Sequence, residues 1–246
     1  ILMVDSSGVI QKSRKGLSEH KKQFATSKKA STLKDALKGA DVFLGLSIAD
    51  VVTIAMVKSM ARNPIVFACA NPDPEITYED AMSARSDLIF ATGRSDHPNQ
   101  VNNVLGFPFI FRGALDVRAT GINEEMKLAA VHAIAELARE PVPEIVNSAY
   151  DTKNMTFGPE YIIPKPLDPR LITWVAPAVA KAAIKSKVSQ HTITDWAAYK
   201  QELIERLGLD NKLIRVITSK AKQNSKRVVF AEADSYKILK AAQIVN

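Results

Sequence analysis

The chain has a single cysteine among its 246 residues, so an intrachain disulfide is impossible and nothing points to secretion. Cys69 lies inside the apolar run 65–70, and no histidine flanks it. A buried bystander thiol is therefore preferred to a reactive nucleophile. This cysteine content favours a cytoplasmic protein.

Long hydrophobic runs are also missing, since no apolar stretch approaches the roughly 20 residues of a membrane span. Residues 1–5 have neither the basic segment nor the small-residue cleavage site of a signal peptide. They do not begin with Met and have the pattern of a strand, so we expect the chain to start within a domain. No membrane partner is expected.

The net charge of +7 comes largely from residues 12–29 and 212–227. These basic segments lack the interleaved aromatic residues of a nucleic-acid binder, and no zinc or RNA-binding motif is present. A solvated basic surface is the preferred interpretation, and contacts to the phosphates of an anionic cofactor are the alternative. Nucleic acid is not expected as a partner.

Short apolar runs alternate with helical patterns in the first part of the chain, which is typical of a doubly wound α/β fold. The runs are nearly continuous, as expected for strands buried on both faces of a parallel sheet. Expected strands cover residues 1–4, 42–46, 65–70 and 88–91, and expected helices cover residues 32–38, 49–61 and 78–84.

Small or polar residues follow each expected strand, where α/β folds bind ligands. They are Asp5, Gly45-Leu46-Ser47, Ala70-Asn71-Pro72 and residues 92–95. Asp5 precedes Ser-Ser-Gly, and two interpretations stay open: an acid that holds the adenosine ribose of a dinucleotide, or an Asp that forms a turn. The glycine-rich loop of such a site would precede residue 1.

Three Asn and one Gln within residues 99–103 form the densest polar cluster, immediately before the apolar run 107–111. Amides supply donors and acceptors without the desolvation cost of a charge. Together with Asn71, the cluster indicates one polar site at the carboxyl edge of a buried sheet.

The chain after residue 95 is mainly helical. We expect a proline-rich loop at 157–169, and a histidine, His132, that packs or lies on the surface. A boundary is expected between about 185 and 226. Expected helices cover residues 107–117, 124–139 (capped by Asn123), 169–185, 192–207, 211–225 and 235–245, with a strand at 227–231.

Several motifs closely resemble bacterial NADP-dependent malic enzyme in its long form, which is fused to a phosphate acetyltransferase-like domain. They lie at residues 71–76, 92–104, 107–117 and 122–127. The resemblance implies an incomplete Rossmann-like sheet in 1–187, a helical linker at 188–225, and the first strand and helix of a second α/β domain at 226–246.

The resemblance also implies an activity: malate and NADP, with NAD possible, give pyruvate, carbon dioxide and NADPH with Mg²⁺ or Mn²⁺. Asn71 and Asn103 match the two active-site asparagines of the family, and Asn102 is the alternative if the register shifts by one. Gly45 and Ser47 join Asp5 as cofactor contacts. Where the family commonly has Gly-Pro after Ser47, this chain has Ile48-Ala49, and the bulkier Ile48 is expected to crowd the cofactor's approach.

Lys21 and Lys22 are candidates for contact with the 2′-phosphate of NADP, and two solvated lysines are the alternative. The family's catalytic Tyr and Lys, its acidic metal ligands and its glycine loop belong before residue 1. We therefore expect the chain alone to be inactive. We also expect its uncovered apolar faces to make it aggregate or require a partner. A non-catalytic interaction module is the alternative function, and the complete enzyme is expected to be a homo-oligomer.

Overall fold

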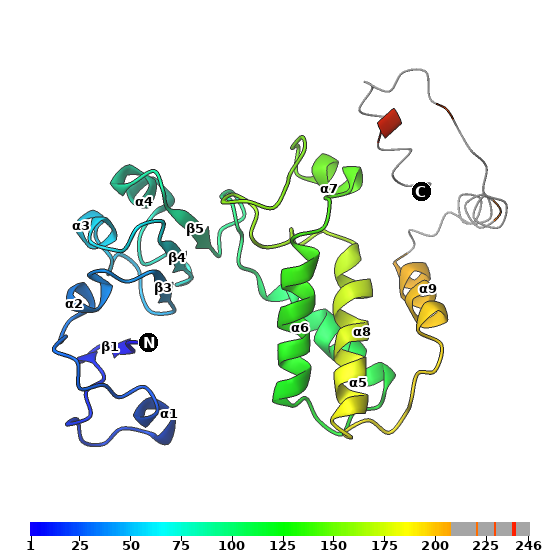
Figure 1. Ribbon diagram of the computed structural model, residues 1–246, viewed down its shortest axis with the longest axis horizontal. Helices are drawn as coiled ribbons and strands as arrows, with labels where there is room; N and C mark the ends of the chain where they lie inside the picture. Colours follow the sequence, from blue (N-terminus) through cyan, green and yellow to red (C-terminus); the bar gives the residue numbers. More distant parts are fainter. Residues whose placement is uncertain (208–219, 221–228, 230–237, 240–246) are drawn as a thin grey trace. The chain divides into compact units, whose positions relative to one another are not determined.

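The computed structural model describes residues 1–207, 220, 229, 238 and 239 (Figure 1). The chain divides into two compact units, Ile1–Thr192 and Ile193–Asn246, which are described separately. The first unit contains a parallel sheet followed by a group of helices, so the predicted α/β class is confirmed.

The parallel sheet consists of β3 (Val42–Gly45), β4 (Ile65–Ala68) and β5 (Ile89–Thr92), in that spatial order. Their pairing aligns Gly45 with Ala68 and Ala68 with Thr92, so the three strands end at the same level. The predicted strands at 42–46, 65–70 and 88–91 are therefore present with small shifts of their ends.

Three helices contribute to one apolar core with this sheet: α2 (Leu33–Leu37), α3 (Ile54–Lys58) and α4 (Tyr78–Ala84) (Figure 1). Each begins after a threonine whose hydroxyl accepts a hydrogen bond from a backbone amide of the first turn. The helix expected over 49–61 is shorter because the capping hydroxyl of Thr53 fixes its start at Ile54. The core buries residues such as Val57, Val66 and Phe90.

The expected strand at 1–4 does not join the parallel sheet. Instead, β1 (Val4–Asp5) pairs antiparallel with β2 (Gly8–Val9). The turn between them forms because the Asp5 carboxylate accepts from the Ser7 amide at 3.0 Å, and Gly8 adopts a φ of 97°. A short helix that the sequence pattern did not predict, α1 (Glu19–Lys22), follows.

One face of β3 is open, although near-continuous burial was expected for all the strands. Val42 and Leu44 are 54% and 62% exposed, whereas the intervening Phe43 packs against the core. Alternate residues of a strand point to opposite faces, so these two side chains mark one uncovered apolar face. This is the kind of face that the sequence analysis expected to need a partner.

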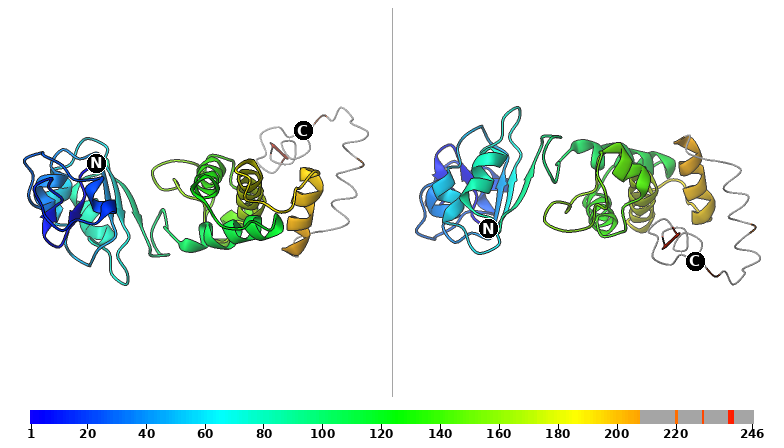
Figure 2. Two further views of the ribbon diagram at one scale, coloured as in Figure 1. Left: turned by 90° about the horizontal axis from the view of Figure 1, so that it is seen from below. Right: turned by 90° about the horizontal axis from the view of Figure 1, so that it is seen from above.

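The rest of the first unit is built around two crossings of α8 (Arg170–Lys185), with α5 (Phe107–Asp116) and with α6 (Glu124–Leu137). Figure 1 and both views of Figure 2 keep α6, in green, beside α8, in yellow. Asn123 caps α6 as predicted, with its side-chain oxygen 3.1 Å from the Met126 amide. The short helix α7 (Glu144–Ala149) was not predicted.

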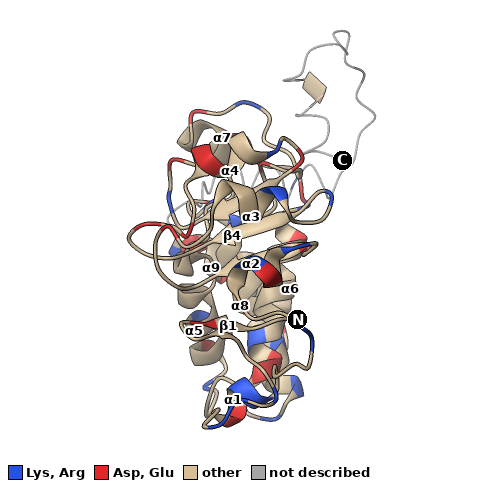
Figure 3. Cartoon of the chain, turned by 90° about the vertical axis from the view of Figure 1, so that its left-hand side faces the viewer, with Lys and Arg blue, Asp and Glu red and all other residues tan. Residues whose placement is uncertain are grey.

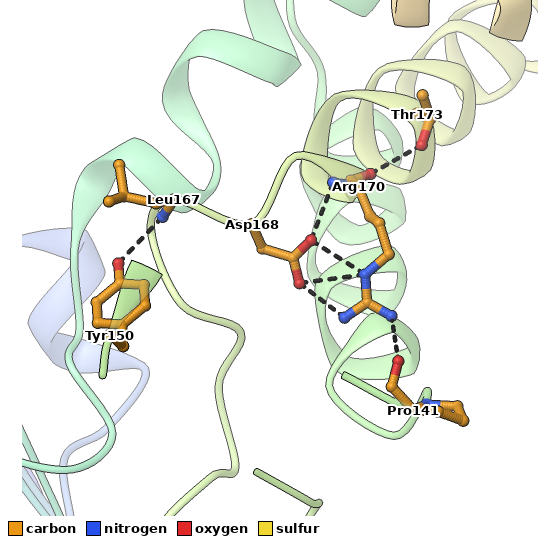
Figure 4. A network of polar contacts seen from close by, with 6 residues as sticks. All are labelled: Pro141, Tyr150, Leu167, Asp168, Arg170 and Thr173. Carbon is orange, nitrogen blue, oxygen red and sulfur yellow. Dashed lines mark hydrogen bonds and ion pairs between the residues drawn. The ribbon is translucent and has the colours of Figure 1, made fainter. Parts of the chain in front are cut away.

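The proline-rich loop has no helix or regular strand but is fastened at its end (Figure 4). The fully buried Asp168 carboxylate binds the Arg170 guanidinium, whose other nitrogen donates to the Pro141 carbonyl at 2.8 Å. The Tyr150 hydroxyl accepts from the Leu167 amide at 3.1 Å. These bonds fix the chain where it enters α8.

The described part of the second unit is mainly α9 (Trp196–Arg206), where the Asp195 carboxylate accepts from two amides of the first turn. The predicted helices at 211–225 and 235–245 and the strand at 227–231 lie largely outside the described residues, and the predicted domain limits stay predictions. No helix within the described ranges is long and apolar enough to cross a membrane.

We predict that Gly113→Ala destabilises the protein by about 1–3 kcal/mol, although Ala normally favours a helix over Gly. A Cβ on Gly113 would lie 2.4 Å from the Ala176 carbonyl oxygen, at the crossing of α5 and α8. Urea unfolding measures the loss. Gly121→Ala is the matched control, because no heavy atom lies within 4 Å of its added Cβ. Equal losses in the two variants would contradict the close crossing.

Candidate functional site

The carboxyl edge of the parallel sheet places three loops side by side, because Gly45, Ala68 and Thr92 are aligned. The amide cluster starts at this edge: Gln100 forms a parallel bridge with Thr92, and the Val101 amide donates to the Thr92 carbonyl at 2.8 Å. The strands therefore bring the segment after β4 and the amide cluster to one edge.

Asn71 and Asn103, the two asparagines expected in the site, are both exposed. Asn71 follows β4, and Asn103 opens the short 3-10 helix η1 (Asn103–Leu105). Neither amide side chain is bonded to another residue in the part of the chain that the structure describes. Both are therefore available to a ligand.

The other amides of the cluster have structural partners. Asn102 caps η1, with its side-chain oxygen 3.0 Å from the Val104 amide. Asn99 is only 2% exposed; its nitrogen donates to the Phe90 and Pro159 carbonyls, and its oxygen accepts from the Ile162 amide. The side chains of Asn99 and Asn102 therefore stabilise the loop, whereas that of Asn103 is exposed to solvent.

Gly45 and Ser47, which were expected to contact the cofactor, both lie against the Glu75 side chain. The Glu75 carboxylate accepts from the amide and the hydroxyl of Ser47 at 2.8 and 3.1 Å. A Cβ on Gly45 would lie 2.4 Å from the Glu75 carboxyl carbon. A residue with a Cβ would not fit at position 45, because the Glu75 carboxylate occupies the adjoining space. Ile48, in the same loop as Ser47, is exposed.

Cys69 is half-buried, and burial together with the nearby Glu75 charge raises the pKa of its thiol. A raised pKa keeps the thiol protonated and poorly nucleophilic near neutral pH. The interpretation of Cys69 as an unreactive residue therefore agrees with its surroundings.

Asp5 forms a small charged cluster with Arg14 and Lys21. The guanidinium of Arg14 binds both carboxylate oxygens at 2.9 and 3.0 Å, and the Lys21 ammonium lies 2.7 Å from one of them. Hydrogen bonds from Arg14, and then from Lys21, hold the pKa of Asp5 well below its usual range. Asp5 is therefore an anion held beside two cations.

Lys22 lies apart from this cluster, because its ammonium pairs with Glu19 at 2.5 Å. Figure 3 marks the lysine positions along the ribbon of α1 in blue. Of the two lysines proposed for a phosphate contact, the structure therefore brings only Lys21 to Asp5.

No group of three or more His, Cys, Asp or Glu side chains that would hold a metal ion exists among the residues described. The candidate site consists of two exposed amides at the sheet edge and a cationic cluster at the β1–β2 turn. Such groups bind anionic or amide-bearing ligands.

Three residues of this region were missed from the sequence: Arg14, Glu75 and Asn99. Arg14 stands among many lysines and arginines in a basic segment, and Glu75 within a proline-rich turn resembles a surface acid. Asn99 was visible as part of the amide cluster, but its burial depends on Pro159, 60 positions away. Asn99 has a positive φ, which Asn tolerates better than most residues, and this tolerance is the only local hint of its special role.

The comparisons with known proteins agree on one family. Residues 1–147 match the family model of the malic enzyme NAD-binding domain. The chain is 53% identical over 245 residues to the NADP-dependent malic enzyme of Salmonella typhimurium, which covers 99% of the chain and 32% of that protein. A "Probable NADP-dependent malic enzyme" of Rickettsia prowazekii is 52% identical over 248 residues.

Among solved structures, Entamoeba histolytica malic enzyme is similar with a TM-score of 0.69 and 32% identity, over 99% of this chain and 48% of that chain. The chain spans 32% of the length of the two sequence relatives above.

We predict that Asn99→Asp destabilises the protein at neutral pH by about 3 kcal/mol, because a buried carboxylate would face two carbonyl oxygens. Chemical denaturation at pH 7 measures the loss. Since the pKa of this new acid would be raised on folding, stability should recover partly as the pH falls and the acid is protonated. Asn154→Asp, at an exposed positive-φ site, is the control. A loss no greater than in the control would refute the role of Asn99.

Proposed function

Because the chain belongs to the malic enzyme family, whose NAD-binding domain it matches over residues 1–147, we propose that it supplies part of a site for malate and NADP. The reaction oxidises malate and releases carbon dioxide to give pyruvate and NADPH. The observation that carries the proposal is the pair Asn71 and Asn103, two exposed amides without a partner among the described residues, both on loops that leave the carboxyl edge of the sheet.

The two amides suit a substrate that carries carboxylates. Each side-chain nitrogen donates to a carboxylate oxygen, and each side-chain oxygen accepts from a hydroxyl or from a carboxamide. Because they carry no charge, they orient malate without repelling its anionic groups. NADP, when bound, accepts the hydride that malate loses on oxidation. Asn102 is the alternative contact, although its side-chain oxygen already caps η1.

The cationic cluster suits the adenosine end of NADP. Arg14 and Lys21 both contact Asp5 at the end of β1, and their charges complement a 2′-phosphate. Asp5 alone would favour a ribose hydroxyl and would repel a phosphate. With two cations bound to it, the cluster carries a net charge of about +1 and accepts a phosphate.

The described residues do not provide a site for the divalent metal that the family requires. In this proposal the chain binds and orients malate and NADP, and the acid–base and metal chemistry comes from the part of the relatives that the chain does not span. The open face of β3 at Val42 and Leu44 supports the need for a covering partner. The same open face would also serve the alternative, a non-catalytic interaction module.

Co-expression tests the function. The chain alone should form no NADPH from malate. Together with the N-terminal region of a long-form malic enzyme it should do so, and Asn71→Ala or Asn103→Ala should lower the rate at least about tenfold, since a bond to a charged group is lost. Asn154→Ala is the matched control. Complexes that form without any activity would favour the interaction module. Activity of the chain alone would refute the proposal that the N-terminal region supplies the acid–base and metal chemistry.

For the cofactor, Lys21→Ala should weaken binding of 2′,5′-ADP about tenfold and leave 5′-AMP binding unchanged, because only the former carries the 2′-phosphate. Lys22→Ala, whose lysine pairs with Glu19, should change neither affinity. Calorimetry or NMR titration of the chain measures both ligands. Equal effects of the two substitutions would remove Lys21 from the phosphate site.

A further inference from the structure

Glu75 is a fully buried carboxylate that the proposed chemistry does not use. It follows β4 by seven residues and lies within the segment 71–76. Its charge has no cation within salt-bridge distance in the described chain and is instead held by three hydrogen-bond donors. Burying a carboxylate is unfavourable unless such donors compensate for the lost hydration, so the three donors are essential to its burial.

The three donors come from two different loops. One carboxylate oxygen accepts from the Ser47 amide at 2.8 Å and from the Ser47 hydroxyl at 3.1 Å, after β3. The other oxygen accepts from the Ala70 amide at 3.0 Å, after β4 and one residue before Asn71. One side chain therefore joins the ends of two neighbouring strands.

The backbone around Glu75 strengthens the same connection. Its carbonyl accepts from the Val52 amide at 2.9 Å, and the Pro74 carbonyl accepts from the Asp50 amide at 3.2 Å. The loop between β3 and α3 is thus tied along its length to the segment that follows Asn71. Gly45 lacks the Cβ that would collide with the carboxylate.

We propose that Glu75 is a positioning residue, whose carboxylate locks the loops after β3 and β4 into one rigid edge and so fixes the backbone that presents Asn71. In this account Gly45 is required to admit the carboxylate, and Ser47 is required to bind it. The importance of this edge for malate and NADP rests on the proposed function, but the lock itself does not.

Amide hydrogen exchange of the chain tests the lock without any substrate. Glu75→Gln keeps the volume but replaces an acceptor by an amide group, so exchange at Ser47 and Ala70 should accelerate at least about tenfold, which corresponds to about 1.4 kcal/mol. The exchange rates of core amides such as that of Val66 should not change. Uniform acceleration would indicate general stabilisation, and no acceleration would refute the lock.

A double-mutant cycle tests whether Gly45 is required only to leave space for the Glu75 carboxylate. Gly45→Ala should accelerate exchange at Ser47 and Ala70 as Glu75→Gln does, because the new Cβ displaces the carboxylate. On the background of Glu75→Ala, where that space is empty, Gly45→Ala should have little further effect. Additive effects would show that Gly45 serves another purpose and would overturn the proposed pairing. Gly121→Ala is again the control for a change of glycine in open space.

In the co-expressed enzyme, Glu75→Gln should lower kcat/KM for malate about tenfold while the unfolding midpoint stays within the range of the Asn154→Ala control. An unchanged kcat/KM together with accelerated exchange would refute the link from the lock to Asn71. If no variant of the co-expressed pair is active, the proposed function fails, and the exchange measurements still decide whether Glu75 is a lock.

Discussion

The in-register pairing of β3, β4 and β5 is the constraint on which the candidate site depends. Because Gly45, Ala68 and Thr92 end at one level, the segments that follow them leave the sheet from a common edge. Parallel strands require crossover connections, and here α3 and α4 provide them while supplying the core. The same packing that buries Val66 and Phe90 therefore sets where Asn71 leaves the sheet.

Two carboxylates of the first unit, Glu75 at this edge and Asp5 in the β1–β2 hairpin, are stabilised in contrasting ways. The Glu75 carboxylate is fully buried and satisfied by neutral donors, whereas Asp5 is partly exposed and satisfied by two cations. Buried hydrogen bonds define one geometry, while exposed ion pairs are weak and can exchange partners. The first arrangement suits a rigid frame, and the second suits a surface that receives an anion.

The sequence predicted the fold class, the three parallel strands and most helices, because continuous apolar runs and capping residues are local signals. It also predicted the common carboxyl edge of these strands. The assignment of Asn71 and Asn103 to the site, which came from the resemblance to malic enzymes, stays a prediction. Sequence analysis missed the β1–β2 hairpin because an apolar run does not reveal its pairing partner. The assignment of Gly45 and Ser47 to a cofactor stays a prediction. Their contact with Glu75 was not foreseen, because it is set by tertiary structure, which no local pattern encodes.

Asn99 also has a consequence for the order in which the molecule is assembled. Its side chain connects Phe90, within β5, to a loop about 60 residues farther along the chain. Contacts at such separation form only after the entropy of closing a long loop has been overcome. The sheet can form from nearby segments, whereas the loop that carries Asn103 gains its last anchors only once the proline-rich segment is in place.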